Sequence, residues 1–177
     1  MITFKFSRHE KVALLGVLLI LGVLFISSSM TYHEQELHPA FIQHYLGFLE
    51  RSIGHWQFYY AGHWQSSASD GGTAGMTEFV LRKFAHFSTY FALGVCAFLG
   101  FKRLSRISWL APAMIWFFCI AMAAFDEYHQ FLTGDRTPSV HDVMLDSVGA
   151  LCGIALALIA YRLYHFYRKA RIIRRVS

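Results

Sequence analysis

Long apolar runs separated by short polar segments dominate the sequence. Four of these runs carry few charges and have about the 20 residues that a helix needs to cross the hydrocarbon core of a bilayer. They predict four membrane-spanning helices, at about residues 11–30, 79–101, 107–130 and 142–164. The first run also resembles the apolar part of a signal peptide and is followed by a serine triplet, so a cleaved leader is the alternative. Because three more spans follow, we interpret the first run as an uncleaved anchor.

The segment between the first two spans, residues 31–78, is too long to be structureless in a compact protein. Apolar residues recur at helical spacing from Ile42 to Ile53, and Pro39 suits the first turn of a helix. This pattern predicts an amphipathic helix on the outer face of a helix bundle. The tryptophans and tyrosines of "GHWQFYYAGHWQ", which follow, are typical of the membrane–water interface.

Composition and charge support the same fold class. Hydrophobic residues make up 55% of the 177 residues and charged residues 15%, whereas soluble domains have about 25% charged residues. Twelve of the sixteen basic residues flank the spans on one predicted side. These are Lys5, Arg8, Lys11, Lys102, Arg103, Arg106, Arg162, Arg168, Lys169, Arg171, Arg174 and Arg175. The positive-inside rule therefore predicts that both termini are cytoplasmic.

The whole chain, residues 1–177, is thus predicted to be one all-α integral membrane domain, a four-helix bundle with an amphipathic outer-face helix. The basic tail, residues 165–177, is predicted to lie in the cytoplasm and to contact anionic lipid headgroups rather than nucleic acid. The three cysteines fall inside spans and are expected to be packing residues.

Several polar residues interrupt the second, third and fourth spans. Ionisable groups are expensive in a membrane and indicate function by default. They are Lys83, His86, Tyr90, Asp126, Glu127, Gln130, Asp142 and Asp146. Helical spacing places those of each span on one face, and alternating span directions place all of them near the outer boundary of the membrane. We interpret them as a shared polar site; the alternative is a structural ion-pair network that holds three helices together.

These positions also carry a family resemblance. The peptides "KFAHFSTYFALG" and "FDEYHQFLTGDRTPSVHDVMLDSVGALCG" resemble the VanZ-like membrane proteins, whose pattern is K-x-x-H-F-x-x-Y, D-E-x-x-Q, a G-R-x turn and D-x-x-x-N-x-x-G-x-x-x-G. The matching residues are Lys83, His86, Phe87, Tyr90, Asp126, Glu127, Gln130, Arg136, Asp142, Gly149 and Gly153. The chain departs from the pattern at Asp146, where the family usually has Asn, and at Asp135, which is inserted before Arg136.

The resemblance implies a multi-pass protein of the bacterial cytoplasmic (inner) membrane with a role in the cell envelope. The family is similar to a protein linked to teicoplanin resistance, a form of glycopeptide resistance. It implies no particular reaction, so the chemistry has to be argued from the residues.

Two kinds of chemistry fit the polar residues. The first is acid–base catalysis on a bound phosphate, with His86 titrating near neutrality and Arg136 forming a planar fork for the phosphate. Its catalytic candidates are His86, Asp126, Glu127 and Asp142, and its substrate-binding candidates are Lys83, Tyr90, Gln130 and Arg136. The second is a divalent cation held by carboxylates. The candidate metal ligands are Asp126, Glu127, Asp142 and Asp146.

The predicted function is an outward-facing site that binds a phosphate-bearing envelope lipid or a lipid-linked cell-wall precursor, and in the enzymatic case modifies it. The alternative is a scaffold or lipid-binding module without catalysis. The sequence contains no G-x-S-x-G motif, glycine-rich phosphate loop or H-E-x-x-H motif. The inner halves of the second and fourth spans are almost wholly apolar, which disfavours a transport path.

Overall fold

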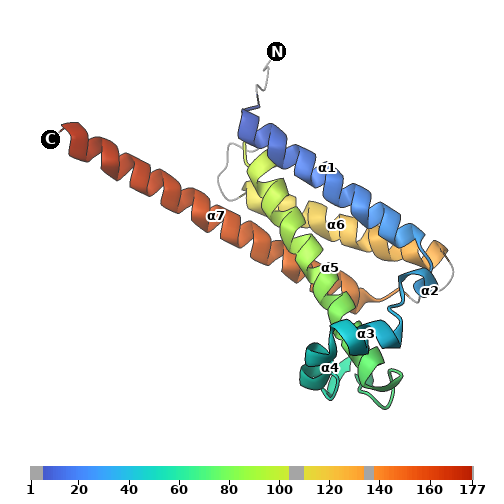
Figure 1. The fold of residues 1–177 in the computed structure, drawn as a ribbon. Coiled ribbons are helices and arrows are strands. Elements are labelled where there is room, and N and C mark those ends of the chain that lie inside the picture. Colours follow the sequence, from blue (N-terminus) through green and yellow to red (C-terminus); the bar gives the residue numbers. More distant parts are fainter. Residues whose placement is uncertain (1–5, 104–109, 134–137, 177) are drawn as a thin grey trace.

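The computed structural model describes residues 6–103, 110–133 and 138–176. The described part of the chain is almost entirely helical, with one small hairpin (Figure 1). The elements are α1 (Arg8–Ser29), α2 (Tyr32–Gln35), α3 (Pro39–Tyr45), α4 (Gly47–Ile53), β1 (Phe58–Tyr60), β2 (His63–Gln65), α5 (Gly72–Phe101), α6 (Leu110–Leu132) and α7 (Val140–Val176).

Four helices, α1, α5, α6 and α7, are long and apolar enough to cross a membrane, which confirms the four predicted spans. Figure 1 shows the start of α1 and the end of α7 on one side of the bundle and the segment from α3 to β2 at the other end. This arrangement is the one expected of four spans that alternate in direction. The assignment of the shared side to the cytoplasm stays a prediction from the basic residues.

Two helices extend beyond the predicted spans. Helix α5 begins at Gly72, seven residues before the predicted start of the second span at residue 79. Helix α7 continues to Val176, so the predicted basic tail is helical where it is described. Hydropathy locates the bilayer core, whereas a helix can continue beyond it. The first turn of α5 is held by packing, because Thr73 donates a hydrogen bond to Glu50 of α4. The Arg- and Lys-rich end of α7 consists of good helix formers.

Helices α5 and α7 approach each other more closely than ordinary side chains would allow. A Cβ atom added at Gly153 would lie 2.1 Å from the carbonyl oxygen of Phe91, and one added at Gly149 would lie 2.5 Å from that of Phe87. A Cβ atom added at Gly94 of α5 would likewise lie 2.3 Å from the carbonyl oxygen of Ala150. Small residues thus bring the two backbones into contact, and the small-xxx-small spacing of Gly149 and Gly153 is typical of such close helix packing.

The core of the bundle lies where α1, α5, α6 and α7 meet, and large apolar side chains also cover the outside of the same helices. Leu18 and Phe117, for example, are 67% and 65% exposed. Apolar residues on both the inside and the outside are expected of helices surrounded by lipid.

The outer segment differs from its prediction in one respect. The amphipathic helix expected up to Ile53 is divided at Leu46, whose φ of −118° and ψ of 17° are not helical. Gly47 follows directly, and glycine has low helix propensity because its backbone is the most flexible. The result is two short helices, α3 and α4, which pack against α5.

The aromatic stretch after α4 forms a two-stranded antiparallel hairpin in which Tyr60 pairs with His63. Its turn has positive φ at both central residues, 51° at Ala61 and 91° at Gly62. This is the backbone that two-residue hairpin turns require. The hairpin carries Tyr60 to the polar side chains of the bundle, where its hydroxyl donates to Asp142.

Candidate functional site

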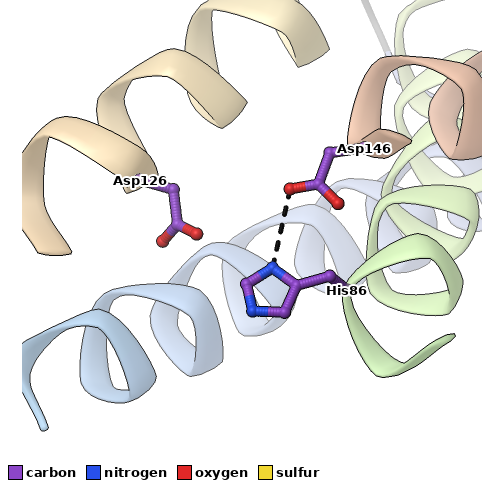
Figure 2. Close-up of side chains that lie close together, drawn as sticks. All are labelled: His86, Asp126 and Asp146. Carbon is purple, nitrogen blue, oxygen red and sulfur yellow. Dashed lines mark ion pairs between the residues drawn. The ribbon is translucent and has the colours of Figure 1, made fainter. Parts of the chain in front are cut away.

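Three helices each contribute one side chain to a cluster of two buried carboxylates and a partly buried imidazole. One side-chain N or O atom from each of His86 (α5), Asp126 (α6) and Asp146 (α7) lies within 4.8 Å of the other two. Figure 2 shows the three side chains pointing toward one another from separate helices. Asp126 is 5% exposed and Asp146 is 1% exposed. We call these three residues the His–Asp cluster.

The close packing of α5 and α7 explains how the His–Asp cluster forms. Gly149, one turn after Asp146, contacts the backbone of Phe87, the residue that follows His86. This contact brings the Nδ1 atom of His86 to 3.5 Å from Oδ2 of Asp146. Helix α6 is held against the same part of α7, because the indole N–H of Trp116 donates a 2.9 Å hydrogen bond to the carbonyl of Ser147.

Asp126 is well supplied with hydrogen-bond donors. The amide of Gln130, one turn later, donates to Oδ2 at 3.0 Å. The hydroxyl of Ser28, at the end of α1, lies within hydrogen-bond distance of both Oδ1 and the Leu24 carbonyl. A fourth helix therefore reaches the His–Asp cluster. Ser28 was not among the sequence candidates, although the serine triplet at the end of the first span was a signal that could have identified it.

Asp146 has a different environment. Among the residues that the structure describes, none donates a hydrogen bond to either of its carboxylate oxygens. The 3.5 Å separation from His86 is an ion-pair distance, longer than a normal N–H···O bond. Within the same described ranges, Nδ1 of His86 and the hydroxyl of the fully buried Tyr90 also have no hydrogen-bond partner. Native proteins seldom leave buried polar atoms in this state.

A second polar group lies on the outer side of the His–Asp cluster. Nζ of Lys83 is 2.5 Å from Oδ1 of Asp142, and the hydroxyl of Tyr60 donates to the same oxygen at 2.6 Å. The ammonium group also lies 5.3 Å from the centres of the Tyr60 and Phe79 rings. Burial and the Asp142 carboxylate raise the pKa of Tyr60, which keeps its hydroxyl protonated. We call Lys83, Asp142 and Tyr60 the outer ion pair.

The outer ion pair joins the hairpin to α5 and α7. Sequence reasoning identified Lys83 and Asp142 but missed Tyr60. A tyrosine among interfacial aromatic residues gives no sign that it will contact a carboxylate 82 positions later in the chain.

The remaining sequence candidates are distributed around these two groups. Glu127 is 7% exposed and accepts a 2.9 Å hydrogen bond from the backbone N–H of Ser139, which ties the end of α6 to the start of α7. Of the four candidate metal-ligating carboxylates, Asp126 and Asp146 thus lie together with His86, whereas Asp142 and Glu127 have other partners. Arg136 lies outside the described residues.

A cavity of about 200 Å³ leads from the outside of the bundle to Asp126. It lies between α1, α5 and α6 and is lined by Leu21, Leu24, Phe25, Ser28, Tyr90, Met122, Phe125, Asp126 and His129. Phe25 and Phe125 are 57% and 55% exposed, and both rings stack on His129. The cavity therefore has an aromatic, lipid-facing side and a polar end. We call it the lateral cavity.

This arrangement permits two kinds of chemistry. An imidazole between two carboxylates can transfer a proton to or from a bound group. The same N and O atoms can hold a divalent cation. The lateral cavity offers apolar surface to a hydrocarbon chain whose polar end reaches Ser28, Tyr90 and Asp126.

Comparison with known proteins supports the resemblance found in the sequence. The family model VanZ/LLP1 matches residues 13–161, which include every residue of the His–Asp cluster and the outer ion pair. No curated protein and no solved structure matches the chain. The match covers most of the chain, and the VanZ-like proteins are membrane proteins linked to resistance. The chain is therefore a multi-pass membrane protein that belongs to the VanZ/LLP1 family.

Proposed function

We propose that the protein binds a phosphate-bearing lipid of the bacterial envelope, with a hydrocarbon chain in the lateral cavity and the polar end at the His–Asp cluster, where it is chemically modified. The observation that carries this proposal is the continuity of the cavity. It begins between exposed aromatic side chains that face lipid and ends at a buried carboxylate. A path of this kind suits an amphipathic molecule that enters from the side of the bundle.

The size of the lateral cavity fits part of a lipid. Pockets for drug-sized ligands have about 300–1,000 Å³, whereas this cavity has about 200 Å³. It would hold a section of one chain while the rest of the molecule stays in the bilayer. At the polar end, the hydroxyl of Tyr90, which has no hydrogen-bond partner among the described residues, would donate to a headgroup or ester oxygen. His86 would move the proton.

Within this proposal, the residues of the outer ion pair have a structural role. Lys83 is already neutralised by Asp142, and Tyr60 completes the contact. For Lys83 to meet a phosphate, it would have to exchange one anionic partner for another. We therefore assign the substrate to the His–Asp cluster and the lateral cavity. Lys83 and Arg136 stay the candidate cations for the headgroup.

A pair of matched substitutions tests lipid binding. Leu21→Trp puts a large ring into the lateral cavity, and Leu19→Trp makes the same change at a side chain that is 63% exposed on α1. Lipids that copurify with the protein are extracted and quantified by mass spectrometry. We expect Leu21→Trp to lose most of the bound phospholipid or lipid-linked precursor and Leu19→Trp to keep it. Equal lipid in the two variants would refute binding in this cavity.

Lipid analysis of whole cells separates an enzyme from a binding module. Cells with the wild-type protein, Asp126→Asn or His86→Ala are compared with cells that lack it. A modifying enzyme changes the lipid profile, and both variants abolish the change while lipid still copurifies. If no lipid changes but binding persists, the protein is a binding module, the alternative in which the polar residues mainly hold the helices together.

A further inference from the structure

We propose that the His–Asp cluster is a binding site for one divalent cation of the first transition row, Zn²⁺ or Mn²⁺. The proposal goes beyond the lipid function and does not rest on it. Its basis is the convergence of one imidazole and two carboxylates from three helices (Figure 2), with one ligand atom from each within 4.8 Å of the other two.

The distances are close to those of a metal site. Zn²⁺ binds His nitrogen and carboxylate oxygen at about 2.0–2.2 Å, so neighbouring ligands of a tetrahedral ion lie about 3.3 Å apart. The 3.5 Å between Nδ1 of His86 and Oδ2 of Asp146 is near that value. Asp126 would have to move inward by roughly 1.5 Å at most, which rotation of its side chain can provide.

The environment of Asp146 points independently to a missing positive group. Its side chain is 1% exposed, and no residue in the described ranges donates a hydrogen bond to either oxygen. Nδ1 of His86, which faces it, has no hydrogen-bond partner within those ranges either. A buried carboxylate without partners is strongly disfavoured. A cation between the two residues would satisfy all of these atoms at once.

The charge of the cluster also matches a divalent ion. Asp126 and Asp146 carry two negative charges, and His86 binds a metal as the neutral imidazole. A bound M²⁺ would therefore balance the charge of the two carboxylates that hold it, in a membrane where buried charges are most expensive.

The ligand types restrict the identity of the metal. Ca²⁺ and Mg²⁺ prefer oxygen ligands only, and soft thiolate sites select copper or iron–sulfur clusters. One imidazole with two carboxylates suits Zn²⁺ or Mn²⁺. Ser28 and Gln130, which donate to Asp126, would orient this ligand as outer partners commonly do.

Three protein ligands leave at least one coordination position open, which is typical of catalytic rather than structural sites. Because Asp126 also lines the lateral cavity, a ligand in that cavity would lie close to the cation. An anionic headgroup would then meet a positive ion in place of two carboxylates, which would otherwise repel it.

Metal analysis of the purified protein, delipidated and carrying a tag without histidine, tests this inference. We expect about one Zn²⁺ or Mn²⁺ per chain in the wild type, and at least a tenfold loss of affinity in His86→Ala and Asp146→Asn, which each remove a ligand. Asp142→Asn is the matched control, because it removes a carboxylate of the outer ion pair and leaves the cluster intact. His63→Ala controls for binding to exposed histidines and should also keep the metal.

Several results would overturn the inference. One is a wild-type protein that contains no metal and whose melting temperature, after stripping with EDTA, does not rise when Zn²⁺ or Mn²⁺ is added. Another is Asp146→Asn binding metal as well as the wild type. If the variants do not fold, X-ray absorption of the zinc-loaded wild type decides, since sulfur ligands or several histidines would contradict the proposed set. Unchanged lipid binding in Leu21→Trp, with metal bound as in the wild type, would refute only the lipid function.

Discussion

The contact between α5 and α7 should be the most sensitive point of the fold, and Gly149→Ala tests it. The substitution adds one methyl group at the position where α7 touches the backbone of α5, one turn from Asp146. It changes no polar atom. Any effect on stability or on the His–Asp cluster therefore comes from the separation of the two helices.

The size of the effect can be worked out from the distances. The new Cβ would lie 2.5 Å from the Phe87 carbonyl oxygen, whereas ordinary contact begins at 3.4 Å. The helices must therefore separate by roughly 0.9 Å, and overpacking of this kind costs about 1–3 kcal/mol. The same shift would lengthen the separation of His86 and Asp146 from 3.5 Å to roughly 4.4 Å, beyond the distance of about 4 Å that defines an ion pair.

Gly22→Ala is the matched control. Gly22 lies in α1, where nothing is within 4 Å of an added Cβ, so the change should stabilise the helix by up to about 1 kcal/mol. Melting in lipid nanodiscs is followed with a thiol-reactive dye that reaches the buried Cys119 after unfolding. We expect Gly149→Ala to melt about 2–10 °C below the wild type and Gly22→Ala at or above it. If both variants melt alike, the two helices are not in close contact at this level.

Three further predictions concern other parts of the molecule. Tyr60→Phe removes the hydrogen bond to the carboxylate of the outer ion pair and should lower the stability of this contact by about 1.5–3 kcal/mol. The outer segment should then be cleaved faster by a protease than in Tyr45→Phe, the control at an exposed site. Equal cleavage rates would contradict the contact. In intact cells, a cysteine at position 68 in place of Ala68 should react with an impermeant reagent and one in place of Ser105 should not; labelling of the latter would reverse the predicted orientation. Glu10→Gln weakens the capping box of α1 and the 2.8 Å ion pair with the exposed Arg103. It should lower the free energy of unfolding by about 1 kcal/mol in the same melting assay. An unchanged melting temperature would show that neither interaction contributes.

The number of spans could be predicted because each span is a long apolar run, and the common level of the polar residues was predicted from helical periodicity. Helical spacing fixes the face and height of each side chain, and alternating spans bring equal heights together. The proximity of His86, Asp126 and Asp146 follows from these rules. Their roles in binding or catalysis stay predictions.

The pairing of individual side chains could not be predicted in this way. Which carboxylate faces Lys83 depends on rotamers and on the rotation of neighbouring helices, and these are set by contacts such as the backbone approach at Gly149. Ser28 and Tyr60 come from outside the spans that carry the ionisable residues. Their positions depend on the tilt of α1 and on a hairpin turn, neither of which leaves a periodic pattern.

The two polar groups differ in how completely their atoms have hydrogen-bond or ion-pair partners, and this difference is the reason for placing the proposed site at the His–Asp cluster. In the outer ion pair, ammonium, carboxylate and hydroxyl all have partners at 2.5–2.6 Å, as expected of a network that stabilises the fold. One turn deeper, Asp146 has no hydrogen-bond donor among the described residues. The VanZ-like pattern usually has Asn there, and an amide would bring its own N–H donors to the site, which an aspartate cannot do. The Asp146→Asn variant therefore replaces a carboxylate that needs a positive partner with an amide that can donate hydrogen bonds. If this variant loses the metal and becomes more stable, the carboxylate is present for a ligand rather than for the fold.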